Sequence, residues 1–190
     1  SVFTISNGYH SQKDDSPIEK GFIDISCGYY HTVGLKEDGS IVTWGSNHQA
    51  QRRNSPTDKN YIAIATGCNH CIALKNNGEL VMWGQDDYHS VRLDFPDDKG
   101  YIQMDSGPYH GVALKQDGSI SIWGGRMHDN GELVAESRFC PDDKDYVDIA
   151  CKADNTIALK NDNSFVIFDS NSVVYQGIKT NNNIDLKKIL

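Results

Sequence analysis

The sequence lacks the features that mark several large classes of protein. No apolar run in its 190 residues approaches the roughly 18 residues of a membrane-spanning helix, and the N-terminus has neither a basic region nor a long apolar core. Acidic residues outnumber basic ones by 26 to 18, and the net charge of −8 disfavours binding to nucleic acid through its phosphates. We therefore expect no membrane contact, no nucleic-acid partner and no secretory leader.

Motifs for catalysis and for metal binding are also missing. The sequence has no Gly-x-x-x-x-Gly-Lys phosphate loop, no Gly-x-Ser-x-Gly elbow and no His-Glu-x-x-His. Among five cysteines there is one Cys-x-x-Cys pair, Cys68 and Cys71, without a histidine pair spaced to complete a zinc site. We therefore expect the chain to have no enzymatic activity and to bind neither a cofactor nor a metal ion.

The cysteine count and the absence of Asn-x-Ser/Thr acceptors indicate a compartment. An odd number of cysteines, five, favours reduced thiols over a disulfide framework. We therefore predict that the protein is located in the cytoplasm or in another reducing compartment. A virion is an alternative location. The abundance of Asn, Asp, Ile and Lys fits a bacterial effector or a large-virus protein equally well.

Proline is scarce, and four of the five prolines recur at a regular spacing. Pro17, Pro56, Pro96 and Pro141 are separated by 39, 40 and 45 residues, and the same steps separate Trp44, Trp83, Trp123 and Phe168. Two independent markers with one period indicate an internal repeat. We predict one repeat domain over residues 1–190. Its four blades are predicted at residues 17–45, 56–84, 96–124 and 141–169. Residues 1–16 are predicted to form the last strand and loop of a preceding blade. Residues 170–190 are predicted to form a C-terminal strand or closure segment.

Each repeat predicts three short strands. In the first repeat these are residues 22–25, 31–36 and 40–44, with a tight turn at Asp38-Gly39 before the third strand. A sheet of this size cannot bury both faces alone, so it must stack on its neighbours. The sequence therefore predicts an all-β fold: a partial or small β-propeller of four three-stranded blades plus terminal strands. The recurring Trp44, Trp83, Trp123 and Phe168 are expected in the core between blades.

The repeat also carries a family resemblance. The pattern Gly28-x-x-His31, Leu35-Lys36, Gly39 and Trp44-Gly45 resembles the repeat of the regulator of chromosome condensation family, in the short three-stranded form of bacterial β-lactamase inhibitory protein II. That family forms β-propellers, so the resemblance implies the same fold. It also implies two alternative functions, guanine-nucleotide exchange on a small GTPase and inhibition of an enzyme by a protein. Fold alone does not choose between such functions.

One face of the predicted blades collects the residues that differ most between repeats. The Gly-x-x-His loops and the variable loops after each Trp-Gly should share this face, because strand direction alternates. The candidate protein-binding residues are Tyr29, Tyr30, Arg52, Arg53, Asn69, Tyr88 and Tyr109. Tyrosine and arginine dominate the binding energy of protein interfaces. Our main hypothesis is therefore a non-catalytic protein-binding or structural scaffold module with a protein partner. The recurring His31, His70 and His110 are expected to make structural hydrogen bonds.

The two ends of the repeat array need cover. An open array of four blades would leave apolar faces and strand edges exposed at both ends. We expect either that Val2–Ile5 pairs with the segment after Asp169, or that a second copy or a partner chain covers the ends. The lack of a clear second strand in the tail favours another chain, as in a homo-oligomer.

Overall fold

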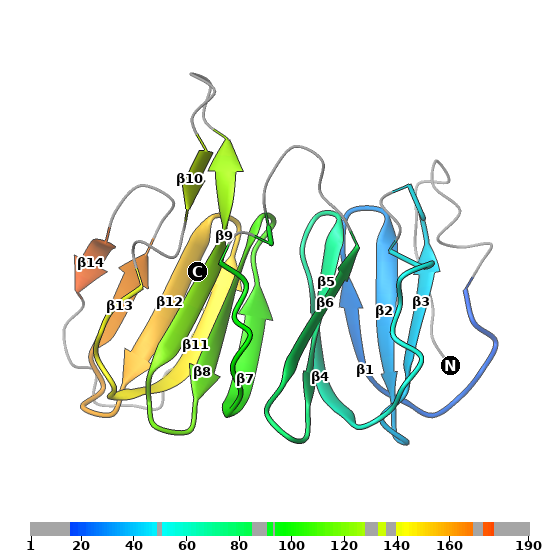
Figure 1. The fold of residues 1–190 in the computed structure, drawn as a ribbon, viewed down its shortest axis with the longest axis horizontal. Coiled ribbons are helices and arrows are strands. Elements are labelled where there is room, and N and C mark those ends of the chain that lie inside the picture. The colour runs from blue at the N-terminus through cyan, green and yellow to red at the C-terminus, as the bar shows by residue number, and fades with distance from the viewer. Residues whose placement is uncertain are drawn as a thin grey trace. The chain divides into compact units, whose positions relative to one another are not determined.

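The computed structural model is all-β, as the repeat predicts. It describes residues 16–48, 51–84, 91–92, 94–127, 133–135, 140–168 and 173–176, and within these ranges the regular elements are all strands. The chain divides into two compact units, Ser1–Asp87 and Tyr88–Leu190. Each unit holds two sheets that follow one another in the sequence (Figure 1).

Each repeat forms one antiparallel sheet whose strands follow their order in the sequence. Unit 1 contains β1 (Phe22–Cys27), β2 (His31–Lys36) and β3 (Ile41–Gly45), then β4 (Tyr61–Thr66), β5 (His70–Lys75) and β6 (Leu80–Gly84). Unit 2 contains β7 (Tyr101–Ser106), β8 (His110–Lys115), β9 (Ile120–Met127) and β10 (Leu133–Ala135), then β11 (Tyr146–Lys152), β12 (Asn155–Lys160), β13 (Phe165–Phe168) and β14 (Val173–Gln176). We refer to these four sheets as blades one to four.

Blade three has one strand more than we predicted, and the predicted C-terminal segment gives blade four a fourth strand. The first two sheets have three strands, whereas β10 pairs with the end of β9 and β14 pairs with β13 to give sheets of four. The segment between Trp123 and Pro141 is longer than its counterparts, so β9 can continue past the tryptophan and β10 can fold back along it (Figure 1). β14 belongs to the predicted C-terminal strand segment. The predicted strand Val2–Ile5 lies outside the described residues.

The hairpins form where the Asp-Gly and Asn-Gly pairs predict them. Gly39, Gly78 and Gly118 have φ values of 74°, 77° and 80°, and Asn163 takes the same left-handed conformation at 64° in blade four. Asparagine is among the few residues that tolerate this region. Each first strand also carries a β-bulge at its second residue, for example between Phe22 and Asp24.

The core of each unit lies between its two blades. In unit 1, Val33, Leu35 and Ile41 of blade one form one cluster with residues of blade two that include Ile64 and Trp83. In unit 2, residues of blade three, such as Val112 and Leu114, form the equivalent cluster with Ile149 and Phe168 of blade four. Trp44 and Trp123 are buried as well, with exposures of 2% and 0%. Burial of this kind stabilises each pair of stacked sheets, since neither sheet could cover both of its faces.

Candidate protein-binding surface

Three loops of unit 1 meet at one end of its two blades. The backbone N–H of Tyr29, between β1 and β2, donates a hydrogen bond to the carbonyl of Cys68, between β4 and β5, at 3.4 Å. The N–H of Ser46, just after β3, donates to the carbonyl of Tyr30 at 2.7 Å. These bonds tie the Gly-x-x-His loops of both blades to the loop that follows Trp44-Gly45. We call this end, with Tyr29, Tyr30, Arg52, Arg53 and Asn69, the loop end of unit 1.

Two adjacent tyrosines stand out from this end. Tyr29 is 67% exposed and Tyr30 is 43% exposed. Their rings pack edge to face, with centroids 6.0 Å apart and an interplanar angle of 67°. Aromatic pairs favour this arrangement, and it restricts the side chains before any partner arrives.

The two arginines lie on a turn whose backbone is held by the side chain of Asn47. The backbone N–H groups of Arg52 and Arg53 both donate to Oδ1 of Asn47, at 2.9 and 3.0 Å. Gln51 directly before them is buried, while both arginine side chains are exposed. The Arg52 guanidinium also donates to the carbonyl of Gly45 at 3.5 Å. The loop therefore presents two positive side chains on a backbone that hydrogen bonds hold in place.

The remaining candidates are placed differently. Asn69 is half-buried in the β4–β5 loop of unit 1. Tyr109 is half-buried in the corresponding β7–β8 loop of unit 2. Tyr88 lies outside the described residues. Unit 1 thus brings five of the seven predicted residues to one end, while Tyr88 and Tyr109 belong to unit 2 and remain predictions.

The histidines beneath these loops connect neighbouring blades. Nε2 of His31 lies 3.2 Å from Sγ of Cys71 in the next blade, and both side chains are fully buried. In unit 2, Nε2 of His110 lies 2.9 Å from the hydroxyl of Thr156 in blade four. In both units the histidine of the first blade therefore links its Gly-x-x-His loop to the second strand of the following blade.

The His31–Cys71 pair is uncharged near neutral pH. Burial lowers the pKa of His31 to about 4, against a smaller opposing effect of a hydrogen bond with the His70 backbone. Burial also raises the pKa of the Cys71 thiol well above its usual value. A nucleophilic cysteine requires the thiolate, which this environment disfavours. The pair is suited to packing and not to attack on a substrate.

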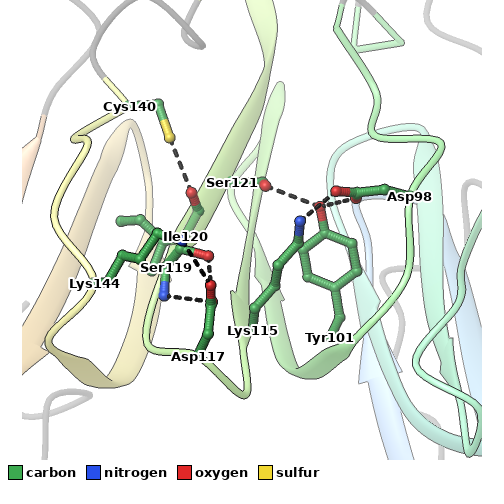
Figure 2. Close-up of polar contacts among 9 residues, drawn as sticks. All are labelled: Asp98, Tyr101, Lys115, Asp117, Ser119, Ile120, Ser121, Cys140 and Lys144. Carbon is green, nitrogen blue, oxygen red and sulfur yellow. Dashed lines mark hydrogen bonds and ion pairs between the residues drawn. The ribbon is translucent and has the colours of Figure 1, made fainter.

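The opposite, hairpin end carries an arrangement that sequence reasoning missed. The lysine that ends each second strand pairs with a carboxylate of the linker before its own blade and lies over the aromatic residue that opens the first strand. The ion pairs are Lys36–Glu19, Lys75–Asp58, Lys115–Asp98 and Lys160–Asp143. The lysine Nζ atoms lie 5.0 to 5.7 Å from the centroids of the rings of Phe22, Tyr61, Tyr101 and Tyr146. Figure 2 shows the group in blade three, with Lys115 beside Tyr101 and Asp98.

A sequence signal for this group does exist. Every linker reads Pro-x-(Asp/Glu)-Lys-x-(Tyr/Phe), beginning at Pro17, Pro56, Pro96 and Pro141. The acidic residue two positions after the proline is the partner of the strand lysine. These ion pairs hold the lysine heads at the surface of their own blade.

The described residues contain neither a metal-binding cluster nor a membrane-spanning helix. Within the described ranges, no three His, Cys, Asp or Glu side chains come together to hold a metal ion. The described part of the chain also contains no helix long and apolar enough to cross a membrane.

Comparison with known families identifies the repeat. Residues 22–51 and 61–90 match the Regulator of chromosome condensation (RCC1) repeat. Blades one and two are each similar to one RCC1 repeat. Both matched segments begin at the first strand of a blade, and they continue past the Trp-Gly pair into the variable loop. No curated protein matches the sequence.

Solved structures with the same fold are β-propeller proteins. Prp20p from Saccharomyces cerevisiae aligns with a TM-score of 0.60 and 17% identity over 80% of this chain and 47% of its own. Human WBSCR16 aligns with a TM-score of 0.60 and 18% identity over 82% and 50%. The CRINKLY WD40 ectodomain of the Arabidopsis thaliana receptor kinase ACR4 aligns with a TM-score of 0.61 and 19% identity over 80% and 52%. The chain thus has the fold of these proteins and spans about half of their length.

Proposed function

We propose that the chain is a non-catalytic protein-binding module that uses the loop end of unit 1. The observation that carries this proposal is the exposed, edge-to-face pair of Tyr29 and Tyr30 on a loop held by the Cys68 carbonyl. A tyrosine gives a large contact area with only two rotatable side-chain bonds, so it loses little conformational entropy on binding. A fixed backbone lowers that cost further.

The chemistry of the same end favours an acidic partner surface. Arg52 and Arg53 are exposed within the same group of loops, although the whole chain carries a net charge of −8. Arginine binds carboxylates in a two-pronged geometry and also stacks on aromatic rings. We therefore propose that the partner presents carboxylates around an apolar patch that receives the tyrosines.

The direct test is capture of binding proteins with matched variants. Tyr29→Ala/Tyr30→Ala should lose the proteins that the unaltered chain captures from an extract, as identified by mass spectrometry. The control is Ile62→Ala/Ile102→Ala, because these side chains are 53% and 54% exposed on first strands and not on the loops. The free energy of unfolding of both variants should lie within about 1 kcal/mol of that of the unaltered chain, since exposed side chains contribute little stability. If the tyrosine variant retains the same proteins, the loop end is not the binding surface.

Nucleotide exchange on a small GTPase is the alternative that the resemblance implies. A solved relative, Prp20p, was described together with its binding to Gsp1p and histones. The likeness to that protein is one of fold, at 17% identity over about half of its length. We expect the chain not to accelerate nucleotide release from a Ran-type GTPase, and acceleration would replace the binding proposal with exchange.

A further inference from the structure

In unit 2, a cysteine, a histidine and a threonine meet between blades three and four. Sγ of Cys151, near the end of β11, lies 3.5 Å from Nε2 of His110 on β8 and 3.4 Å from the hydroxyl of Thr156 on β12. The same Nε2 atom lies 2.9 Å from the Thr156 hydroxyl. The thiol is therefore within reach of a proton acceptor, both directly and through the hydroxyl.

The cysteine is the most exposed member of this group. Thr156 and His110 are 2% and 5% exposed. Cys151 is half-buried, and the next residue, Lys152, is exposed. The backbone N–H of Cys151 donates to Oδ2 of Asp105 on β7 at 2.9 Å. The sulfur thus sits on a backbone that a hydrogen bond holds, beside a buried imidazole and with partial access to solvent.

Three of the other cysteines are either closed to solvent or bonded to a group that takes up no proton. Cys68 is buried, and so is Cys71, although its Sγ lies 3.2 Å from Nε2 of His31. Cys140 is half-buried, but its thiol donates to the carbonyl of Ile120 at 3.1 Å (Figure 2). Burial also raises the pKa of the Cys140 thiol. Each of these thiols therefore lacks either access or a base.

Cys27 provides an internal comparison for Cys151. The two cysteines occupy the same position in blades one and four, because Cys27 pairs in register with Thr32 as Cys151 does with Thr156. Cys27 is exposed, and its sulfur accepts a hydrogen bond from the Thr32 hydroxyl at 3.9 Å. Solvent exposure alone would make Cys27 the more reactive thiol, whereas a neighbouring base would make Cys151 the more reactive one.

We propose that Cys151 is a reactive thiol that exchanges with small disulfides, with His110 as its base. The thiol proton moves to Nε2 of His110 while Sγ attacks one sulfur of a disulfide R–S–S–R. The S–S bond of the reagent breaks and a mixed disulfide forms on Cys151. The leaving thiolate takes the proton from the imidazolium and departs as R–SH, so one disulfide replaces another and no further oxidant is needed. This site lies in unit 2 and is independent of the binding surface proposed for unit 1.

The first test compares thiols within the unaltered chain. The protein is treated at neutral pH with hydroxyethyl disulfide, an uncharged reagent, and the mixed disulfide at each cysteine is followed by mass spectrometry of its peptides. Cys151 should react at least about tenfold faster than Cys27 and Cys140, because a positioned base contributes about a hundredfold or more and half-burial offsets only part of it. If Cys27 reacts fastest, as exposure alone dictates, the proposal is overturned.

Matched histidine variants separate the base from the packing. His110→Gln keeps a polar side chain but removes the base, so the Cys151 rate should fall about tenfold while the Cys27 rate stays the same. The control is His31→Gln, which removes the equivalent contact in unit 1 and should leave the Cys151 rate unchanged. An unchanged or higher Cys151 rate in His110→Gln would overturn the proposal if the Cys140 rate is unchanged. A higher Cys140 rate would mean that unit 2 has loosened, and the comparison within the unaltered chain then decides alone.

Discussion

At the scale of single residues, the Gly-x-x-His loop shows why the histidine requires a glycine three positions before it. A Cβ atom added to Gly28 would lie 2.2 Å from Cε1 of His31, and one added to Gly107 would lie 2.2 Å from Cε1 of His110. The glycine is thus needed for close approach of the imidazole ring, which in turn contacts the next blade. The sequence predicted a structural histidine, but the reason for the glycine became visible only with the ring in place.

Alanine at Gly28 should therefore destabilise the protein. The ring or the loop must move to admit the methyl group, and such overpacking costs about 1–3 kcal/mol. Denaturant unfolding of Gly28→Ala and of Gly107→Ala should show similar losses, because the two sites have the same geometry. Unchanged midpoints would mean that the histidine ring does not sit over the glycine.

The buried His31 should make stability depend on pH in a defined window. Its pKa is about 4 in the folded protein and near 6.5 in the unfolded chain, so the unfolded state binds more protons between these values. The contribution of the neutral ring is complete above pH 6.5 and is lost as the pH falls through 4, to a total of up to about 3 kcal/mol. Urea unfolding at intervals from pH 7 to 4 should show this fall, and it should be smaller in His31→Gln. An equal fall in both proteins would contradict the assignment.

At the scale of the strands, the hairpin turns made the blades predictable. Asp38-Gly39, Asn77-Gly78 and Asp117-Gly118 are local signals, and the structure has a hairpin at each. β10 was not predicted, and β14 was predicted only as a strand somewhere in the C-terminal segment, because neither lies in a repeated part of the sequence. The lysine–carboxylate pairs were missed because they depend on the path of the linker, which local propensity does not specify.

The tyrosine that opens the first strand makes shorter hydrogen bonds in blade three than in blade four, so the contribution of these bonds to stability can be compared. The Tyr101 hydroxyl contacts Oδ1 of Asp98 at 2.6 Å and the Ser121 hydroxyl at 2.9 Å, whereas the Tyr146 hydroxyl has a longer bond of 3.4 Å to Asp143. Tyr101→Phe should therefore cost about 1 kcal/mol more than Tyr146→Phe in thermal unfolding, because it leaves more hydrogen-bonding capacity unsatisfied. Phenylalanine is itself tolerated at this position, as Phe22 shows in blade one. Equal losses would mean that the shorter bonds contribute nothing.

At the scale of the whole molecule, the fold follows from repetition and the function does not. The period of Trp44, Trp83 and Trp123 predicted stacked blades, and the RCC1 match and the propeller structures agree with it. The proposed function instead depends on the loops that differ between blades, such as the pair Tyr29 and Tyr30. Their exposure and mutual packing depend on three loops that converge from separate strands, and a sequence pattern carries little information about that geometry.

The central claim, binding through the loop end of unit 1, is tested most directly by hydrogen exchange on the chain alone and with a captured partner bound. The account predicts slower exchange of the amides of residues 29–31 and 51–55 in the complex, with unchanged exchange at the hairpins of residues 38–40 and 77–79. Those hairpins lie at the opposite ends of the same sheets, so they serve as an internal control. Protection confined to the hairpins, with no change at Tyr29 and Tyr30, would contradict the account.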